Sequence, residues 1–245
     1  MNRPTAVVCS ISKITWETHD TKTFRFDFPP SQRFDFYAGQ YTTLTVNLFN
    51  PKRNRVMPEI RSFSISSPPT ERDYIEITVK PSEKPLVTKL LIERAKVGEV
   101  YTLRGPHGFF YFTDDMADNV VLVGGGVGVA PLRSIYRYIL ERKLEKTVTL
   151  LYSVRTPQDI AFQKELDTLA AERDNFKVVI TITRPEGWAW QGATGRINRD
   201  FILRYLKDPA KSLFYICGPP PMVSDITVVL SHLNVQPSAI KTEKW

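Results

Sequence analysis

A glycine-rich stretch, VGGGVGVAPLRSI (residues 123–135), joins a continuous apolar run to a segment whose apolar residues recur at helical spacing. At the start of such a helix, free backbone N–H groups and the helix dipole make a site for a pyrophosphate. The turn itself is formed by Gly125, Gly126, Val127 and Gly128. We expect these residues to bind the phosphates of a nucleotide, because the motif stands in the strand–turn–helix context that it requires. A turn that serves only close packing is the alternative.

The stretch departs from the usual dinucleotide fingerprint, and the residues after it bear on which nucleotide is bound. Counting from Gly126, Pro131 replaces the third glycine of G-x-G-x-x-G. An Asp or Glu at the end of the next strand would bind the ribose 2′-hydroxyl of NAD, but that run ends LLYSVR, with Arg155 near the place. The run after it ends ITITR, which brings Thr183 and Arg184 to the same edge. Two guanidinium groups can hold the 2′-phosphate of NADP bidentately, so we expect NADP, with NAD as the alternative.

These residues need a sheet that brings strand ends together, and the second half of the chain has the pattern of one. Apolar runs alternate there with segments of helical spacing. The runs are NVVLVGGG, TVTLLYSV, FKVVITIT and SLFYICG, and the helical segments are LRSIYRYILERK, IAFQKELDTLAAE, NRDFILRYL and PMVSDITVVLSHL. Strands and helices that alternate at this interval predict a parallel sheet with helices on both faces.

The first half of the chain has a different periodicity. Short segments rich in Val, Ile, Thr, Phe and Tyr are separated by Pro and Gly turns, and one helical segment, residues 86–95, interrupts them. The predicted strands are AVVCSISKITW, TKTFRFDF, QYTTLTVNL, RSFSIS, YIEITVK and EVYTLRG. This spacing predicts an antiparallel β-barrel or sandwich. We therefore expect two domains, a β-barrel over residues 1–113 and an α/β parallel-sheet domain over 119–245, joined by a linker at 114–118.

The composition is that of an ordinary globular protein, with 245 residues, 42% of them hydrophobic. No apolar run approaches the roughly 20 residues of a membrane span, and the N-terminus lacks a signal-peptide core. We therefore expect a cytoplasmic protein with no membrane partner. The two cysteines, Cys9 and Cys217, cannot make a disulfide framework or a four-cysteine metal site. The three histidines are scattered, so we expect no protein-bound metal.

The formal net charge is +7. A nucleic-acid binder usually concentrates its Lys and Arg residues on one motif, but here they are spread out, with PKRNR (residues 51–55) the only dense cluster. We therefore expect no nucleic acid. A merely soluble surface and an acidic partner protein remain the two explanations of the charge. Nothing in the sequence assigns an oligomeric state.

Several short motifs stand in one order along the chain: RSFS at 61–64, GPHGFF at 105–110, GVGVAP at 126–131, CGPPPM at 217–222 and the ending EKW. With these motifs the chain resembles the ferredoxin–NADP reductase family over almost its whole length. The resemblance implies an FAD-binding antiparallel barrel followed by an NADP-binding α/β domain. GQY at residues 39–41 also stands where the family has it.

The resemblance assigns roles in flavin binding to residues of the first half. In the motif Arg61-Ser62-Phe63-Ser64, it implies that Arg61 holds the FAD pyrophosphate and Phe63 packs on the isoalloxazine ring. It also implies that Ser64 hydrogen-bonds near the reactive flavin nitrogen. The other residues assigned to the flavin are Val79 and Lys80 at a strand end and Val87 and Thr88 in the segment PLVT.

Two positions depart from the family pattern. Pro85 stands where the family's second phosphate motif has glycine, so one backbone N–H contact is lost or replaced. Val127 stands where the family has threonine, which removes a side-chain hydrogen bond to the nucleotide. Arg61, Val87 and Thr88 remain available to hold a pyrophosphate.

The resemblance also assigns the hydride-transfer site. The residues implied to line the nicotinamide are Cys217, Gly218, Pro219 and Met222. Cys217 would pack against the reacting carbon as a polarizable wall and not as a nucleophile. Glu243 would donate a proton or orient groups beside Ser64. Trp245 would cover the flavin face and leave when NADPH arrives. The alternatives are a buried core cysteine at Cys217, a solvated residue at Glu243 and a core plug at Trp245.

The expected function is an FAD-dependent reductase. Many members of the family carry a fused ferredoxin domain with C-x4-C-x2-C spacing, and this chain lacks those cysteines. We therefore expect NADPH to exchange electrons, through FAD, with a separate carrier, and the positive charge favours an acidic ferredoxin or flavodoxin. One alternative is an NADH-using reductase component of a multi-component oxygenase. Another, of a different class, is a non-catalytic flavoprotein docking subunit.

Overall fold

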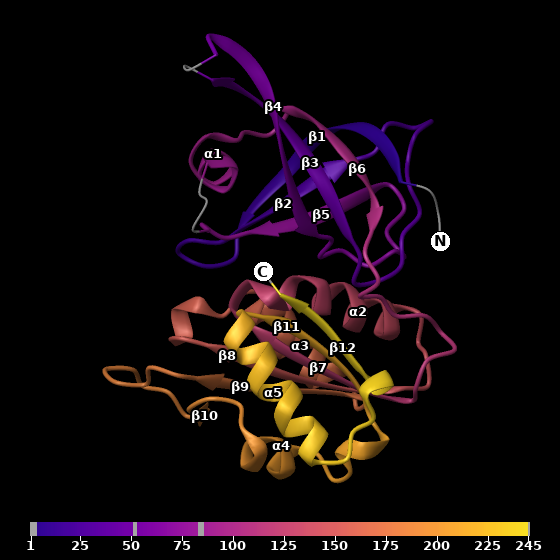
Figure 1. Ribbon diagram of the computed structural model, residues 1–245, viewed down its shortest axis with the longest axis vertical. Coiled ribbons are helices and arrows are strands. Elements are labelled where there is room, and N and C mark those ends of the chain that lie inside the picture. Colours follow the sequence, from indigo (N-terminus) through magenta and orange to yellow (C-terminus); the bar gives the residue numbers. More distant parts are fainter. Residues whose placement is uncertain (1–3, 51–52, 83–85, 245) are drawn as a thin grey trace. The chain divides into compact units, whose positions relative to one another are not determined.

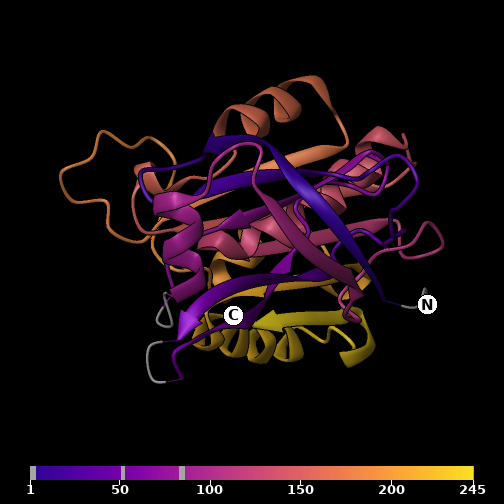
Figure 2. The ribbon, with the colours of Figure 1, turned by 90° about the horizontal axis from the view of Figure 1, so that it is seen from above.

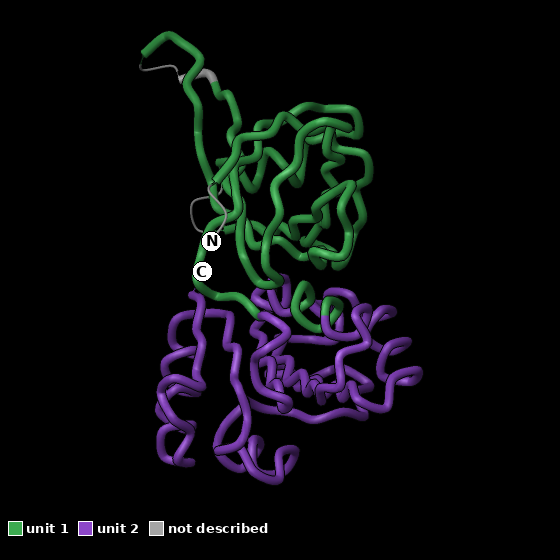
Figure 3. Tube along the Cα trace, turned by 90° about the vertical axis from the view of Figure 1, so that its right-hand side faces the viewer, with its two compact units in different colours: residues 1–112, 133–138 green, residues 113–132, 139–245 purple. Residues whose placement is uncertain are grey.

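The computed structural model describes residues 4–50, 53–82 and 86–244. Its chain divides into two compact units, coloured separately in Figure 3. Unit 1 contains Met1–Phe112 together with Arg133–Tyr138, and unit 2 contains Thr113–Leu132 and Ile139–Trp245. The middle of one helix therefore groups with the first unit although its ends group with the second.

Unit 1 is built on a six-stranded antiparallel sheet with the order β4-β3-β6-β1-β2-β5 (Figure 1). The strands are β1 (Thr5–Trp16), β2 (Lys22–Asp27), β3 (Tyr41–Asn50), β4 (Arg55–Ser64), β5 (Tyr74–Val79) and β6 (Val100–His107). The one long helix of the unit before residue 112, among the described residues, is α1 (Leu86–Arg94). The edge strands β4 and β5 meet at a bridge between Ile65 and Ile77, so the sheet curls toward closure as a barrel does.

Alternation of side chains creates the core of this sheet. On β1, Val7, Cys9 and Ile11 are buried and the residues between them are more exposed, which is the period of two that a one-sided strand requires. The same core contains Phe24 and Phe26 from β2. Both phenylalanine side chains are fully buried, so their burial is a main source of stability for unit 1.

The β3–β4 hairpin is longer than the sequence predicts. The expected strand began at Arg61, but β4 begins at Arg55 and pairs with β3 in register from Asn50↔Arg55 to Tyr41↔Ser64. Asn54 adopts a left-handed conformation next to the turn, which asparagine tolerates better than most residues. The hairpin projects away from the rest of unit 1 (Figures 1 and 3). The sequence Arg55–Ile60 contains Pro58 and charged residues, so only pairing with β3 makes it a strand.

Unit 2 is built on a parallel sheet with the order β10-β9-β8-β7-β11-β12. Its strands are β7 (Asn119–Gly125), β8 (Thr147–Val154), β9 (Phe176–Ile182), β10 (Ala193–Thr194), β11 (Leu213–Gly218) and β12 (Ile240–Lys244). The helices are α2 (Val129–Glu141), whose middle groups with unit 1, and α3 (Gln163–Glu172), α4 (Arg199–Tyr205) and α5 (Pro220–His232). Four consecutive residues of β7, Val120–Val123, are buried, which requires cover on both faces of the sheet.

The two-domain fold predicted from the sequence is confirmed, and the differences lie at short or weakly patterned elements. Strand β12 was not predicted as an element, because IKTEK is mostly polar; it forms by parallel pairing with β11. Figures 1 and 2 show β12 at the edge of the sheet with α5 alongside it. Strand β10 is two residues long and was also missed.

We searched the described helices for one long and apolar enough to cross a lipid bilayer and found none.

Candidate functional site

The crevice of a parallel sheet lies where the strand order reverses. In unit 2 the chain runs outward from β7 through β8 and β9 on one side and reaches β11 on the other. Ligands of such sheets bind beyond the carboxyl ends of the strands at this switch point. The carboxyl end of β7 carries the glycine turn, and the carboxyl end of β11 carries Cys217 and Gly218. The two motifs predicted to bind a nicotinamide nucleotide therefore lie together at the switch point.

The glycine turn packs directly on the loop after β11. A β-carbon at Gly128 would stand 2.3 Å from the carbonyl oxygen of Cys217, and one at Gly125 would stand 2.6 Å from the sulfur of Met222. Backbone atoms leave no room for a side chain at Gly128, whereas at Gly125 the Met222 side chain would have to move and the Pro219 ring stands 2.9 Å away. Close packing, the alternative considered for this motif, is thus a real requirement at Gly125 and Gly128. This packing places the glycine turn and the loop after β11 next to each other at the carboxyl ends of the strands. Phosphate binding by the glycine turn remains a prediction.

Cys217 and Glu243 lie side by side on adjacent parallel strands, as partners in the β11–β12 register. The Cys217 side chain is only 2% exposed. Burial, with a smaller contribution from the nearby Glu243 carboxylate, raises the pKa of the Cys217 thiol well above its ordinary value. The sulfur is therefore a neutral thiol at physiological pH, which suits a packing wall and not a nucleophile.

The arginines expected to recognise a 2′-phosphate are neighbours. The backbone N–H of Arg184 donates to the carbonyl of Arg155 at 2.8 Å, and that of Thr183 donates to Val154 at 2.9 Å. Both arginines are exposed at the carboxyl edge of the sheet. The Thr183 hydroxyl is already committed to the Val154 carbonyl at 3.2 Å. The structure therefore brings the two guanidinium-bearing residues together, while the hydroxyl serves the backbone.

The residues assigned to flavin come from the two edge strands of unit 1 and the helix that follows them. Phe63 on β4 is half-buried and packs against the barrel core, and Ser64 pairs with Tyr41 across β3 and β4. Val79 ends β5. Val87 and Thr88 are buried in the first turn of α1, where helix N–H groups favour an anion.

Arg61 lies on β4 with its guanidinium 3.4 Å from the Glu59 carboxylate, and it also donates to the Ile60 carbonyl at 2.8 Å. About a third of the side chain is exposed. An exposed ion pair of this kind contributes little free energy, so a pyrophosphate can replace Glu59 as the partner of Arg61 at small cost. Ser62, in the same motif, is exposed. This donor set, with an aromatic ring and a helix start, fits a flavin dinucleotide.

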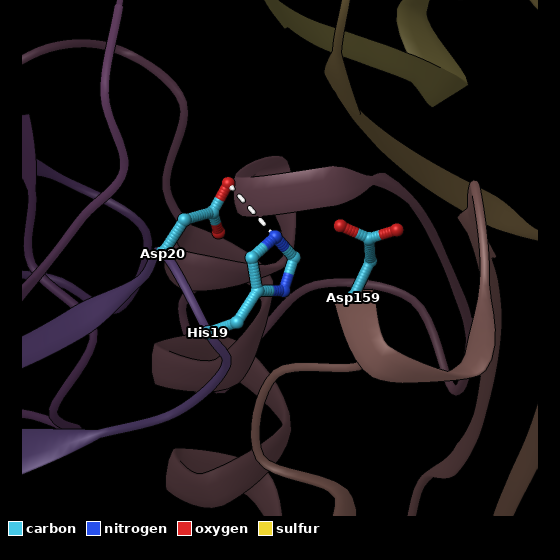
Figure 4. A group of neighbouring side chains, drawn as sticks. All are labelled: His19, Asp20 and Asp159. Carbon is cyan, nitrogen blue, oxygen red and sulfur yellow. Dashed lines mark ion pairs between the residues drawn. The ribbon is translucent and has the colours of Figure 1, made fainter.

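Sequence reasoning missed the residue that holds Lys80. The Asp20 carboxylate lies 3.0 Å from the Lys80 ammonium group, and the hydroxyls of Thr18 and Thr21 donate to it. Burial raises the pKa of Asp20, but Lys80 and the hydroxyl donors outweigh burial and hold the pKa below its ordinary value. The imidazole of His19 lies 3.7 Å from the same carboxylate (Figure 4). The acidic turn THDT was the available signal, but nothing in the sequence pairs it with position 80.

Two of the predicted positions lie outside the described residues. These are Trp245, assigned to the flavin face, and Pro85, at the departure from the second phosphate motif. Their predicted roles remain predictions.

Comparison with known proteins agrees with this geometry. The sequence profile of the "Oxidoreductase FAD-binding domain" family matches residues 8–112, and that of the "Oxidoreductase NAD-binding domain" family matches residues 122–227. An "NADH-cytochrome b5 reductase 1" from Eremothecium gossypii is 31% identical over 236 residues, which are 93% of this chain and 80% of the relative. The chain belongs to the ferredoxin reductase-like family.

Two further matches differ in how much of each relative this chain covers. A "Glycine betaine monooxygenase reductase subunit" from Pseudomonas aeruginosa is 31% identical over 219 residues, 89% of this chain but only 58% of the relative. The crystal structure of a ferredoxin NADP+ reductase from Neisseria gonorrhoeae with bound FAD and NADP superposes with a TM-score of 0.80. It is 23% identical and covers 98% of this chain and 97% of its own, which establishes the shared fold.

Membership in the ferredoxin reductase-like family confirms the predicted cofactor classes. The barrel is an FAD-binding domain and the parallel-sheet unit is an NAD(P)-binding domain. These are oxidoreductases that transfer electrons, and their acceptors differ from one relative to another. The chain spans 58% of the length of the monooxygenase reductase subunit, so the electron acceptor is a separate question.

Proposed function

We propose that the chain is a reductase that passes electrons between NADPH and a separate one-electron carrier, a ferredoxin or flavodoxin. The observation that supports NADPH is the pair of exposed arginines, Arg155 and Arg184, joined by a backbone hydrogen bond of 2.8 Å. An acidic residue at that place would repel a 2′-phosphate, whereas two guanidinium groups can clamp it.

The residues supply binding and orientation, and little acid–base work is needed. When bound, FAD would supply the chemistry that couples two-electron hydride transfer to one-electron transfer. In the proposed roles Arg61, Val87 and Thr88 hold its pyrophosphate, Phe63 supports the ring, and Ser64 hydrogen-bonds near the reactive nitrogen. Hydride transfer requires the donor carbon and acceptor nitrogen to be held roughly 3–3.5 Å apart with water excluded.

On the nucleotide side, Gly125, Gly126, Val127 and Gly128 form the proposed phosphate turn. The neutral thiol of Cys217 gives the nicotinamide a compact, polarizable contact that does not compete as a nucleophile. Glu243, its register partner, is proposed to orient or protonate a group at the reacting centre. The loop residues proposed to line the ring with Cys217 are Gly218, Pro219 and Met222.

The proposed carrier is acidic. The formal net charge of this chain is +7, and opposite net charges accelerate encounter through electrostatic steering. A second candidate is an NADH-using reductase component of a multi-component oxygenase, which the likeness to a glycine betaine monooxygenase reductase subunit favours. A non-catalytic flavoprotein docking subunit is the alternative of another class.

The proposal predicts a yellow protein that NADPH reduces. FAD-loaded protein is mixed anaerobically with NADPH and, separately, with NADH, and flavin bleaching is followed by stopped flow. We expect the kcat/KM for NADPH to exceed that for NADH by roughly a hundredfold, the effect of two charge-assisted hydrogen bonds of about 1.5 kcal/mol each. The reduced protein is then mixed with an acidic ferredoxin or flavodoxin at rising salt, and the electron-transfer rate should fall steeply.

Each outcome separates the candidates. Preference for NADH together with salt-independent carrier reduction would favour the oxygenase reductase. A flavoprotein that neither coenzyme reduces would leave only the docking subunit.

Removing Trp245 tests the proposed cover over the flavin. If its indole stacks on the flavin ring and must leave for nicotinamide, the truncated protein should bind NADP+ and NAD+ about tenfold more tightly, because no stacking energy is lost on displacement. The measurement is a titration of flavin absorbance with each nucleotide, and Trp245→Phe should lie near the wild type. Identical dissociation constants in the wild type and the truncated protein would contradict this role.

A further inference from the structure

The three residues after the flavin motif, Ile65–Ser67, are fully buried and held on all sides within unit 1. The N–H of Ile65 donates to the Gln40 carbonyl at 3.0 Å, and that of Ser66 donates to the Glu76 carbonyl at 2.8 Å. The Thr78 hydroxyl donates to the Ser66 hydroxyl oxygen at 2.9 Å. Since Ser64 directly precedes this segment, the position of its hydroxyl depends on how the segment is fixed.

The carbonyl groups of Ser66 and Ser67 accept hydrogen bonds from the part of α2 that groups with unit 1. Arg133 donates from one guanidinium nitrogen to the Ser66 carbonyl at 3.1 Å, and Ser134 donates to the Ser67 carbonyl at 2.7 Å. One turn farther along the helix, Arg137 pairs with Glu71 at 3.2 Å. The helix therefore contacts the β4–β5 connection through three polar side chains, and Arg133 binds the contacted residue that is nearest in sequence to the flavin motif.

Arg133 is also part of a buried ionic cluster. The same guanidinium nitrogen lies 2.8 Å from one Glu76 carboxylate oxygen, and Arg25 donates to the other oxygen at 3.0 Å. The side chains of Arg133 and Glu76 are each 9% exposed. Burial raises the pKa of Glu76, but Arg133 and Arg25 outweigh it and hold the pKa below its ordinary value. A charged carboxylate thus fixes the Arg133 guanidinium in one orientation, toward the Ser66 carbonyl.

We propose that Arg133 is a positioning residue for the flavin chemistry. By holding the Ser66 carbonyl and the Glu76 carboxylate together, it fixes the backbone on which Ser64 presents its hydroxyl to the flavin. The inference rests on the proposed function, in which Ser64 hydrogen-bonds near the reactive flavin nitrogen. A displacement of about 1 Å at such a group slows a reaction substantially. Arg133 binds the carbonyl of Ser66, two positions after Ser64, so it can act on the rate without touching the flavin.

The test compares Arg133→Met with Arg133→Lys and with Arg137→Met in the full chain. Arg137→Met is the matched control, since it removes a guanidinium from the same helix but leaves the Ser66 carbonyl bonded. FAD affinity is measured by titrating the apoprotein, and the rate of flavin reduction at saturating NADPH is measured per bound flavin. Arg133→Met should raise the FAD dissociation constant and lower the reduction rate about tenfold each, the effect of losing one charge-assisted hydrogen bond.

The conservative variant and a double-mutant cycle separate positioning from general destabilisation. Lysine keeps the charge and N–H donors but loses the planar guanidinium, so Arg133→Lys should lose only about threefold relative to the wild type. In a Ser64→Ala background, Arg133→Met should slow reduction no further, because the group that it positions is gone. If Arg133→Met does not fold, the FAD affinities of Arg133→Lys and Arg137→Lys are compared instead. The proposal then predicts a roughly threefold loss of FAD affinity in Arg133→Lys and none in Arg137→Lys.

Two results would overturn the inference. One is a folded Arg133→Met protein with the FAD affinity and reduction rate of the wild type, even if its Tm falls. The other is a double variant, Ser64→Ala with Arg133→Met, whose reduction rate falls by the product of the two single-variant reductions. A wild type that binds FAD but is not reduced by NADPH contradicts the proposed function instead, and the FAD dissociation constants still decide the role of Arg133.

Discussion

Replacing Gly128 by alanine should lower the thermal stability of the parallel-sheet unit and weaken nucleotide binding together. The new β-carbon would lie 2.3 Å from the Cys217 carbonyl oxygen and 2.8 Å from the Gly218 nitrogen, and backbone atoms cannot move aside as a side chain does. Overpacking of this kind costs about 3 kcal/mol, which lowers Tm by roughly 6–12 °C in a chain of this size. Because the turn must shift, we also expect the NADP+ dissociation constant to rise about tenfold or more.

Gly124→Ala is the matched control. Its β-carbon would meet the Leu132 side chain at 3.2 Å and the Tyr152 ring at 3.5 Å, contacts that small side-chain movements can relieve. We expect less than about 1 kcal/mol of destabilisation and unchanged NADP+ affinity. Tm is measured by tryptophan fluorescence, which includes Trp188 and Trp190 of unit 2, and affinity by calorimetry. Equal behaviour of the two variants would contradict the close packing of the turn on the β11 loop.

Replacing both Arg155 and Arg184 by alanine should remove the preference for NADPH. If each guanidinium contributes about 1.5 kcal/mol to holding a 2′-phosphate, the double variant loses about 3 kcal/mol, or roughly a hundredfold in kcat/KM for NADPH. NADH lacks that phosphate, so its kcat/KM should change by less than about twofold. Steady-state kinetics with both coenzymes and an artificial acceptor give the comparison.

The control for this experiment removes the same charge from the opposite edge of the sheet. Arg204 and Lys207 are exposed at the end of α4, and the surface near Lys207 is shared with the amino-terminal residues Asn119 and Thr147 of β7 and β8. Arg204→Ala with Lys207→Ala should leave both coenzymes unaffected. Equal losses for NADPH in the two double variants would mean that net charge, and not a local clamp, sets the preference.

The elements predicted correctly from the sequence are those with a strong hydrophobic pattern and with pairing strands that lie near in the chain. The runs that became β7, β8, β9 and β11 are apolar on both faces, and such runs belong in a buried parallel sheet whatever the details. The place of Cys217 came instead from the resemblance of CGPPPM to a family motif, and the structure then placed β11 beside β7. The pairing of Arg155 with Arg184 followed from strand order, since carboxyl ends of neighbouring parallel strands share an edge.

What the sequence did not indicate depends on contacts between distant residues. Arg133 reads as one basic residue in an amphipathic helix, and its partner Glu76 lies 57 positions earlier on a different kind of sheet. The charge pattern of LRSIYRYILERK is the same whether the arginine faces water or a buried carboxylate. Likewise, β12 has little apolar character of its own and is specified by the edge of β11. Propensity is a local quantity, whereas these features are decided by tertiary pairing.

The long β3–β4 hairpin has a consequence for how this protein behaves at high concentration. β4 is the outermost strand of its sheet, and an outermost strand offers hydrogen-bonding groups to any other polypeptide it meets. Pro58 removes one backbone donor from β4, and the exposed Arg53 and Arg55 repel the same strand of another molecule. We therefore expect the hairpin to resist strand-to-strand aggregation, so the protein should stay dispersed at high concentration although the hairpin projects from its sheet.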